Sequence, residues 1–210
     1  MKYIKTILCL IIFACLLSGC QIQKDRYVAS ALDAVCRGDY TEYSKLTGKS
    51  SSELAVEQKA FLEIQTDRLL SWLGGDGCSP EMRKRYTGFV KMIYESSKYE
   101  INASGTSENE IDVRISPTTI LTAHTEEIKA CADKFSAANE EFQFSSLSSE
   151  EYTDKYLDSV LGLLGTYLSA PEYGDPQQVT VQIEKNEEGI YTIKPGTVGG
   201  ILEEMLPVPG

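Results

Sequence analysis

The sequence predicts an α+β protein: several N-terminal helices, and an antiparallel four-stranded sheet made of two hairpins with a helix pair inserted between them. Apolar residues recur every three or four positions over residues 25–94 and 121–167, which is typical of helices. They alternate with polar residues over 99–115 and 179–194, which is typical of strands with one solvated face. The composition, 42% hydrophobic and 24% charged over 210 residues, is that of an ordinary globular protein and excludes a disordered or collagen-like chain.

Four helices are expected before the first strand. The first covers residues 25–37, and a second, short one ends before Gly48. Ser50 and Glu53 have the spacing of a capping box, which begins a long third helix. Ser79, followed by proline, is typical of an N-cap and begins the fourth. The buried face of this fourth helix is predicted to hold Met82, Tyr86, Phe89, Val90, Ile93 and Tyr94.

The sheet is expected to form from hairpins over residues 99–115 and 179–194. Two helices separate these hairpins, and the second of them begins after Ser148, in another capping box. For the tail, residues 195–210, the sequence predicts one helical turn in an otherwise loose segment. An apolar stripe marks the first helix of the pair and is formed by Leu121, His124, Ile128, Cys131, Phe135, Ala138 and Phe142.

The N-terminus has the pattern of a secretory signal. Lys2 and Lys5 precede an apolar run over residues 7–17, which is too short to span a bilayer core of about 30 Å as a stable helix. The tetrad over residues 17–20, Leu-Ser-Gly-Cys, resembles the lipobox of bacterial prolipoproteins. By that resemblance, cleavage falls between Gly19 and Cys20.

The lipobox resemblance divides the chain into three parts. Residues 1–19 are the lipoprotein signal peptide, 20–24 a lipidated tether, and 25–210 one α+β domain. The Cys20 thiol would carry a diacylglycerol, whose two acyl chains hold a protein at a membrane far better than one. The expected location is the extracytoplasmic face of the cell membrane, with lipid as a partner through acylated Cys20. An ordinary cleaved signal with a coincidental cysteine is the alternative.

Short motifs also resemble uncharacterised surface lipoproteins of Gram-positive gut bacteria. They are Arg-Gly-Asp-Tyr at 37–40, Leu-Thr-Gly at 46–48, and Tyr-Gly-Asp-Pro at 173–176 before a valine-rich strand. The order of helices and strands is similar to the cystatin-like and NTF2-like α+β folds. These folds host enzymes, binding pockets and inert adaptors alike, so the likeness implies an architecture and no activity.

The sequence holds little catalytic chemistry. His124 is the one histidine, so a histidine-rich metal site is excluded, and its place on the apolar stripe favours packing over a role as a general base. Gly48-Lys49-Ser50 matches the end of a phosphate-binding loop, but Tyr43 stands where that motif needs glycine. Adjacent acidic pairs on helices point apart, which indicates a solvated face. We expect no cofactor and no metal.

The net charge and the cysteine content limit which partners and cross-links the chain can have. The net charge of −11 makes nucleic acid an unfavourable partner, and loss of Lys2 and Lys5 with the signal makes the chain more acidic still. Besides Cys20, the domain has Cys36, Cys78 and Cys131; one pair could form a disulfide, or all three could stay free thiols.

Tyrosine is abundant, with 12 residues, and two interpretations stay open: core-edge packing, or a tyrosine-lined ligand groove. The leading hypothesis is a membrane-anchored, non-enzymatic binding or interaction module for an unknown envelope protein or small ligand. The alternative is a small-ligand-binding or enzymatic pocket of the NTF2-like kind. A closed interior favours the first, and an open cavity between sheet and helices favours the second.

Overall fold

The computed structural model describes residues 24–102, 109–140, 144–185, 191–194 and 197–209. A helix over residues 24–37 comes first in the described part. The elements that follow are α2 (Thr41–Thr47), α3 (Ser51–Trp72), α4 (Pro80–Glu95), β1 (Lys98–Asn102), β2 (Glu110–Ser116), α5 (Thr125–Glu140), α6 (Ser149–Leu168), β3 (Gln177–Lys185), β4 (Tyr191–Ile193) and α7 (Thr197–Met205). The predicted α+β class, with a helix pair between two hairpins, is confirmed.

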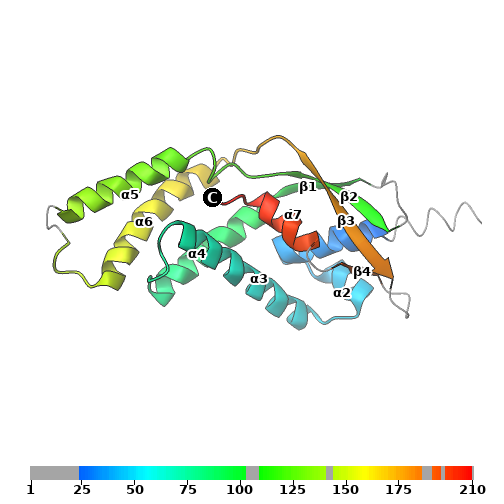
Figure 1. Ribbon diagram of the computed structural model, residues 1–210. Helices are drawn as coiled ribbons and strands as arrows, with labels where there is room; N and C mark the ends of the chain where they lie inside the picture. Colours follow the sequence, from blue (N-terminus) through cyan, green and yellow to red (C-terminus); the bar gives the residue numbers. More distant parts are fainter. Residues whose placement is uncertain (1–23, 103–108, 141–143, 186–190, 195–196, 210) are drawn as a thin grey trace, which may run out of the picture.

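The two hairpins form one antiparallel sheet in the order β1-β2-β3-β4, as the sequence predicts. The central pair, β2 and β3, joins the hairpins and places Val113 opposite Val179. On β2, Ile111, Val113 and Ile115 are fully buried, and the residues between them are not. One face of the sheet is therefore covered, and Figure 1 shows α7 and α4 lying below it.

Helix α4 crosses the middle of the molecule, and all six residues of its predicted buried face are buried. Two of them are tyrosines that bury their hydroxyls as well. Tyr86 donates a hydrogen bond of 2.9 Å to the Leu157 carbonyl of α6, and Tyr94 donates one of 2.9 Å to the Leu202 carbonyl of α7. For these two residues the structure corrects the core-edge interpretation, because neither hydroxyl reaches solvent.

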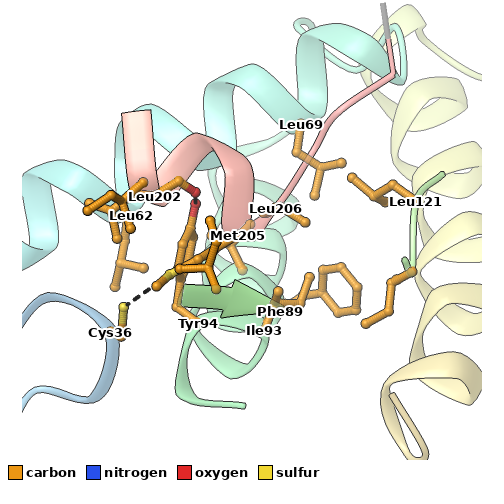
Figure 2. Packing of buried hydrophobic residues seen from close by; sticks show 14 of the residues in the cluster. Cys36, Leu62, Leu69, Phe89, Ile93, Tyr94, Leu121, Leu202, Met205 and Leu206 are labelled. Atoms are coloured by element: carbon orange, nitrogen blue, oxygen red, sulfur yellow. Dashed lines mark hydrogen bonds between the residues drawn. The ribbon is translucent and has the colours of Figure 1, made fainter. Parts of the chain in front are cut away.

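The C-terminal tail is more ordered than the sequence indicates. It forms the helix α7, and four of its side chains are buried: Ile201, Leu202, Met205 and Leu206. Figure 2 shows Leu202, Met205 and Leu206 among side chains of α3 and α4, and the Met205 carbonyl accepts a hydrogen bond of 3.1 Å from the Thr118 amide. Paired glycines lower the helix propensity of this segment, but the apolar area that it buries outweighs that preference.

Helices α5 and α6 form an antiparallel hairpin that extends away from the sheet in Figure 1. Helix α5 begins at Thr125, so Leu121 and His124 lie in the turn before it. Ile128 is buried, but Phe135 is partly exposed and stacks on Phe144 with ring centroids 4.7 Å apart. The outer half of the predicted stripe therefore covers α6 and not the main core; Phe142 lies outside the described residues.

The signal peptide, the lipobox and the tether up to residue 23 also lie outside the described part. Among the residues that are described, no helix combines the length and the apolar character needed to cross a membrane.

We predict that Tyr94→Phe lowers the free energy of unfolding by about 1–2 kcal/mol, because it leaves the buried Leu202 carbonyl without its donor. Urea denaturation followed by circular dichroism measures the change. The matched control is Tyr152→Phe, since the Tyr152 hydroxyl has no hydrogen-bond partner among the described residues. Equal effects of the two substitutions would contradict the role given to Tyr94.

Candidate functional site

A hollow of about 430 Å³ lies along β1, the edge strand of the sheet. We call it the basic groove. Its lining comes from the first helix, β1, β2 and the segment before β3, and consists of Arg37, Ser97, Lys98, Tyr99, Glu100, Arg114, Ser116 and Pro176. Three of these side chains are cationic and one is acidic, which contrasts with the net charge of −11 for the chain.

Strand alternation places the polar side of the groove on the open face of the sheet. Lys98 pairs with Ser116, and Glu100 pairs with Arg114, in the β1–β2 register. Because side chains alternate between faces, these four residues share the face opposite the buried Ile115. The partly buried Tyr99, between Lys98 and Glu100, turns toward the helical layer.

Tyr99 ties the groove to the first helix. Its hydroxyl donates to Asp33 Oδ1 at 2.5 Å, and the Arg37 guanidinium donates to the same oxygen at 2.5 Å. The Arg37 guanidinium also lies 4.7 Å from the centroid of the Tyr99 ring. Burial and the hydrogen bond to Asp33 raise the pKa of Tyr99, so its hydroxyl stays protonated at neutral pH. Arg37 is thus fixed at the groove, with part of its charge shared with Asp33.

Tyr173, in the segment before β3, packs beside Lys98. The Lys98 ammonium lies 3.9 Å from the centroid of the Tyr173 ring. The Tyr173 hydroxyl donates to the Ser96 carbonyl at 2.7 Å, and Thr118 forms a β-bridge with Tyr173. These contacts position the loop that carries Pro176, so the Tyr-Gly-Asp-Pro motif noted in the sequence contributes to one wall of the groove.

Within the described residues, Lys98 and Arg114 are the cations of the groove that form no ion pair with a carboxylate. Glu100 stands opposite Arg114 in the register, yet the exposed Arg114 guanidinium makes no ion pair or hydrogen bond with any residue that the structure describes. Lys98 likewise makes no ion pair within the described ranges, and its ammonium lies over the Tyr173 ring. The groove therefore offers two cations and the Ser116 hydroxyl to a ligand, because the Ser97 hydroxyl donates to the Ile93 carbonyl.

His124 lines a second hollow, of about 310 Å³, at the junction of α5 and α6. Its ring stacks on that of Tyr167, with centroids 3.5 Å apart and planes 3° from parallel. Its Nδ1 atom is 4.0 Å from Glu127 Oε1, which is too long for a hydrogen bond. The other lining residues are Thr119, Ile120, Thr166, Ala170 and Glu172.

The structure places His124 at a partly covered position, with 22% of its side chain exposed. A helix covers one face of its ring, as the sequence indicates, but the other side opens on the hollow. No serine or cysteine stands among the described residues that line this hollow. The hydroxyl of Thr166 donates to the Leu163 carbonyl at 2.7 Å, so it is engaged with its own helix. The described lining thus offers His124 no serine or cysteine nucleophile, and Thr119 and Tyr167 are the other described residues there that carry a hydroxyl.

The three cysteines of the domain are free in the structure. Cys36 is buried in the core, where its Sγ lies 3.8 Å from the Met205 sulfur (Figure 2), and burial raises the pKa of the Cys36 thiol to about 12. Cys78 and Cys131 are partly exposed. Burial and the nearby Asp154 also raise the pKa of Cys78.

Within the described ranges, no three histidine, cysteine, aspartate or glutamate side chains come together as a metal-binding group. The basic groove, by contrast, was not identified from the sequence, because its cations are far apart along the chain and only the β1–β2 register brings two of them together. The signal that could have found it is the pair of basic residues, Lys98 and Arg114, at solvated positions of the predicted hairpin.

The sequence matches no protein-family model and no curated protein. The fold is similar to the crystal structure of ycdA from Bacillus subtilis subsp. subtilis strain 168, a protein provisionally assigned as a lipoprotein. The match has a TM-score of 0.59 and 17% sequence identity, and it covers 88% of this chain. It covers 56% of ycdA, so this chain spans little more than half of that protein. At this identity the likeness concerns the fold alone.

We predict that His124→Gln lowers the free energy of unfolding by about 1 kcal/mol, because the substitution removes the stacking on Tyr167. Urea denaturation at pH 7.5 measures it. Glu127→Gln is the control and should change stability by less than about 0.5 kcal/mol, since its carboxylate is exposed and does not bond the ring. A loss above about 3 kcal/mol for His124→Gln would show a structural role that these contacts do not explain.

We also predict that iodoacetamide at pH 7.5 modifies Cys78 and Cys131 well before Cys36, because the Cys36 thiol is buried and its pKa is about 12. Peptide-resolved mass spectrometry without reductant measures the three rates. In urea all three should react at similar rates. Two cysteines that stay unmodified in urea until a reductant is added would instead reveal a disulfide.

Proposed function

We propose that this protein is a lipid-anchored, extracytoplasmic binding module that acts without catalysis. The observation that carries the proposal is the tetrad over residues 17–20, which follows a short basic segment and an apolar run of signal-peptide length. Acylation of Cys20 would hold the chain at the membrane from outside. Three residues separate Cys20 from the first described helical residue, so the domain would stand close to the lipid surface.

The packing of the interior favours ligand binding at the surface of the fold and not in an internal pocket. A pocket of the NTF2-like kind would lie between the sheet and its helices. That space holds α7, whose Ile201, Leu202 and Met205 side chains are buried against the sheet and helices. Among the described residues, this packing leaves ligand sites to hollows on the outside, and in the basic groove two cations, Lys98 and Arg114, form no ion pair.

Similarity to ycdA supports the proposal in a coarse way. That protein is provisionally assigned as a lipoprotein and has a related fold, which is compatible with a lipid-anchored domain of this architecture. The binding role itself rests on the residues of this chain.

The anchor is tested by Cys20→Ser in the full chain, expressed with its own signal in a bacterial host. We predict that the wild type incorporates radiolabelled palmitate and stays in the membrane pellet after carbonate extraction, and that the variant incorporates none. Cys36→Ser is the matched control, because it removes a buried cysteine and should leave lipidation unchanged. A Cys20→Ser protein that still carried the label would overturn the lipobox interpretation.

A further inference from the structure

We propose that the basic groove binds a small, multivalent oxyanion: a soluble molecule that carries two or more phosphate or carboxylate groups. The proposal deepens the binding role proposed above by naming the site and the ligand class. The geometry that carries it is the meeting of Arg37, Lys98 and Arg114 at one hollow of about 430 Å³. Cavities of this size hold small organic molecules.

Lys98 and Arg114, which form no ion pair among the described residues, stand where one ligand can reach both. Lys98 pairs with Ser116, and Arg114 lies two residues before Ser116 on the same strand, so Lys98 and Arg114 are diagonal neighbours on one face. Diagonal neighbours in an antiparallel pair have Cβ atoms roughly 7 Å apart, which long side chains bridge readily. A guanidinium offers two parallel donors to a phosphate or carboxylate, and an ammonium adds a point charge beside it.

The rest of the lining completes the site for an anion. Arg37 is held at the groove by Asp33 and by the Tyr99 ring, so its position is set before any ligand arrives. Ser116 supplies a hydroxyl beside Lys98 that can donate to the anion, whereas the Ser97 hydroxyl already donates to the Ile93 carbonyl at 3.3 Å.

Negative charges in and around the basic groove limit which ligands can bind there. Glu100 lines the same groove, and the chain as a whole carries a net charge of −11. A long polyanion or an anionic membrane would have to approach this wider negative surface, whereas a small anion meets only the local cations. The groove is therefore suited to a small soluble anion and not to a nucleic acid or a lipid surface.

Isothermal titration of the full chain in nonionic detergent, at fixed ionic strength, tests the proposal, with pyrophosphate and citrate as probes. We expect saturable binding of one or both probes. Lys98→Gln and Arg114→Gln should each weaken it about tenfold, which corresponds to about 1.4 kcal/mol. Lys84→Gln, an exposed lysine on α4 outside the groove, should leave it unchanged. Glu100→Gln should strengthen binding, and Asp76→Asn, which changes the net charge equally, should not.

The outcomes of these experiments distinguish a soluble anion from a lipid headgroup as the ligand of the basic groove. Absence of binding at millimolar probe, or binding that Lys98→Gln and Arg114→Gln leave unchanged, overturns the proposal. Binding to phosphatidylglycerol vesicles and to neither soluble probe overturns it as well, in favour of a lipid headgroup. Arg114→Gln carries the test if Lys98→Gln fails to fold, because the Arg114 side chain is exposed and unpartnered among the described residues. Probe binding in detergent is independent of lipidation, so loss of the anchor in Cys20→Ser would count against the proposed anchoring alone.

Discussion

The fold depends on the burial of one sheet face beneath helices α4 and α7. The buried isoleucines and valines of β2 and β3 need a partner surface, and α7 supplies it although it comes last in the chain. Tyr94 joins the two helices by donating to a carbonyl of α7, in a region where an unpaired polar group would be costly. Tyr86 does the same for α6. Helix α4 therefore holds together segments that lie up to 108 residues away in sequence.

This arrangement also determines where ligands can bind. Since the inner face is filled, the alternation of the strands sends the polar residues of β1 and β2 to the open face. The β1–β2 register then sets two cations diagonally across one edge, while Tyr99 and Tyr173 attach that edge to the first helix and to the loop before β3. The groove is thus a consequence of the same pattern that builds the core, and its rigidity comes from contacts behind it.

The sequence predicts the class, the sheet and the buried face of α4 because these features rest on local periodicity and capping. The capping box at Ser50 and Glu53 is present, for example, as the residue types and spacing indicate. Periodicity alone does not tell which partner a stripe covers: Phe135 is partly exposed and stacks on Phe144 at the outer end of the α5–α6 hairpin. Nor does local propensity reveal α7, whose glycines favour a loop until tertiary contacts bury its apolar side chains. The basic groove could not be predicted in this way, because it depends on the β1–β2 register, which no single segment encodes.

The most direct test of the account is to locate the bound anion by nuclear magnetic resonance. Backbone amide shifts of the full chain in detergent would be followed while pyrophosphate is added. The account predicts that the largest changes fall on residues 97–100 and 114–116, with smaller ones at Arg37. Changes that gather instead around His124 and Tyr167, or that appear nowhere at saturating pyrophosphate, would contradict the assignment of the basic groove as the binding site.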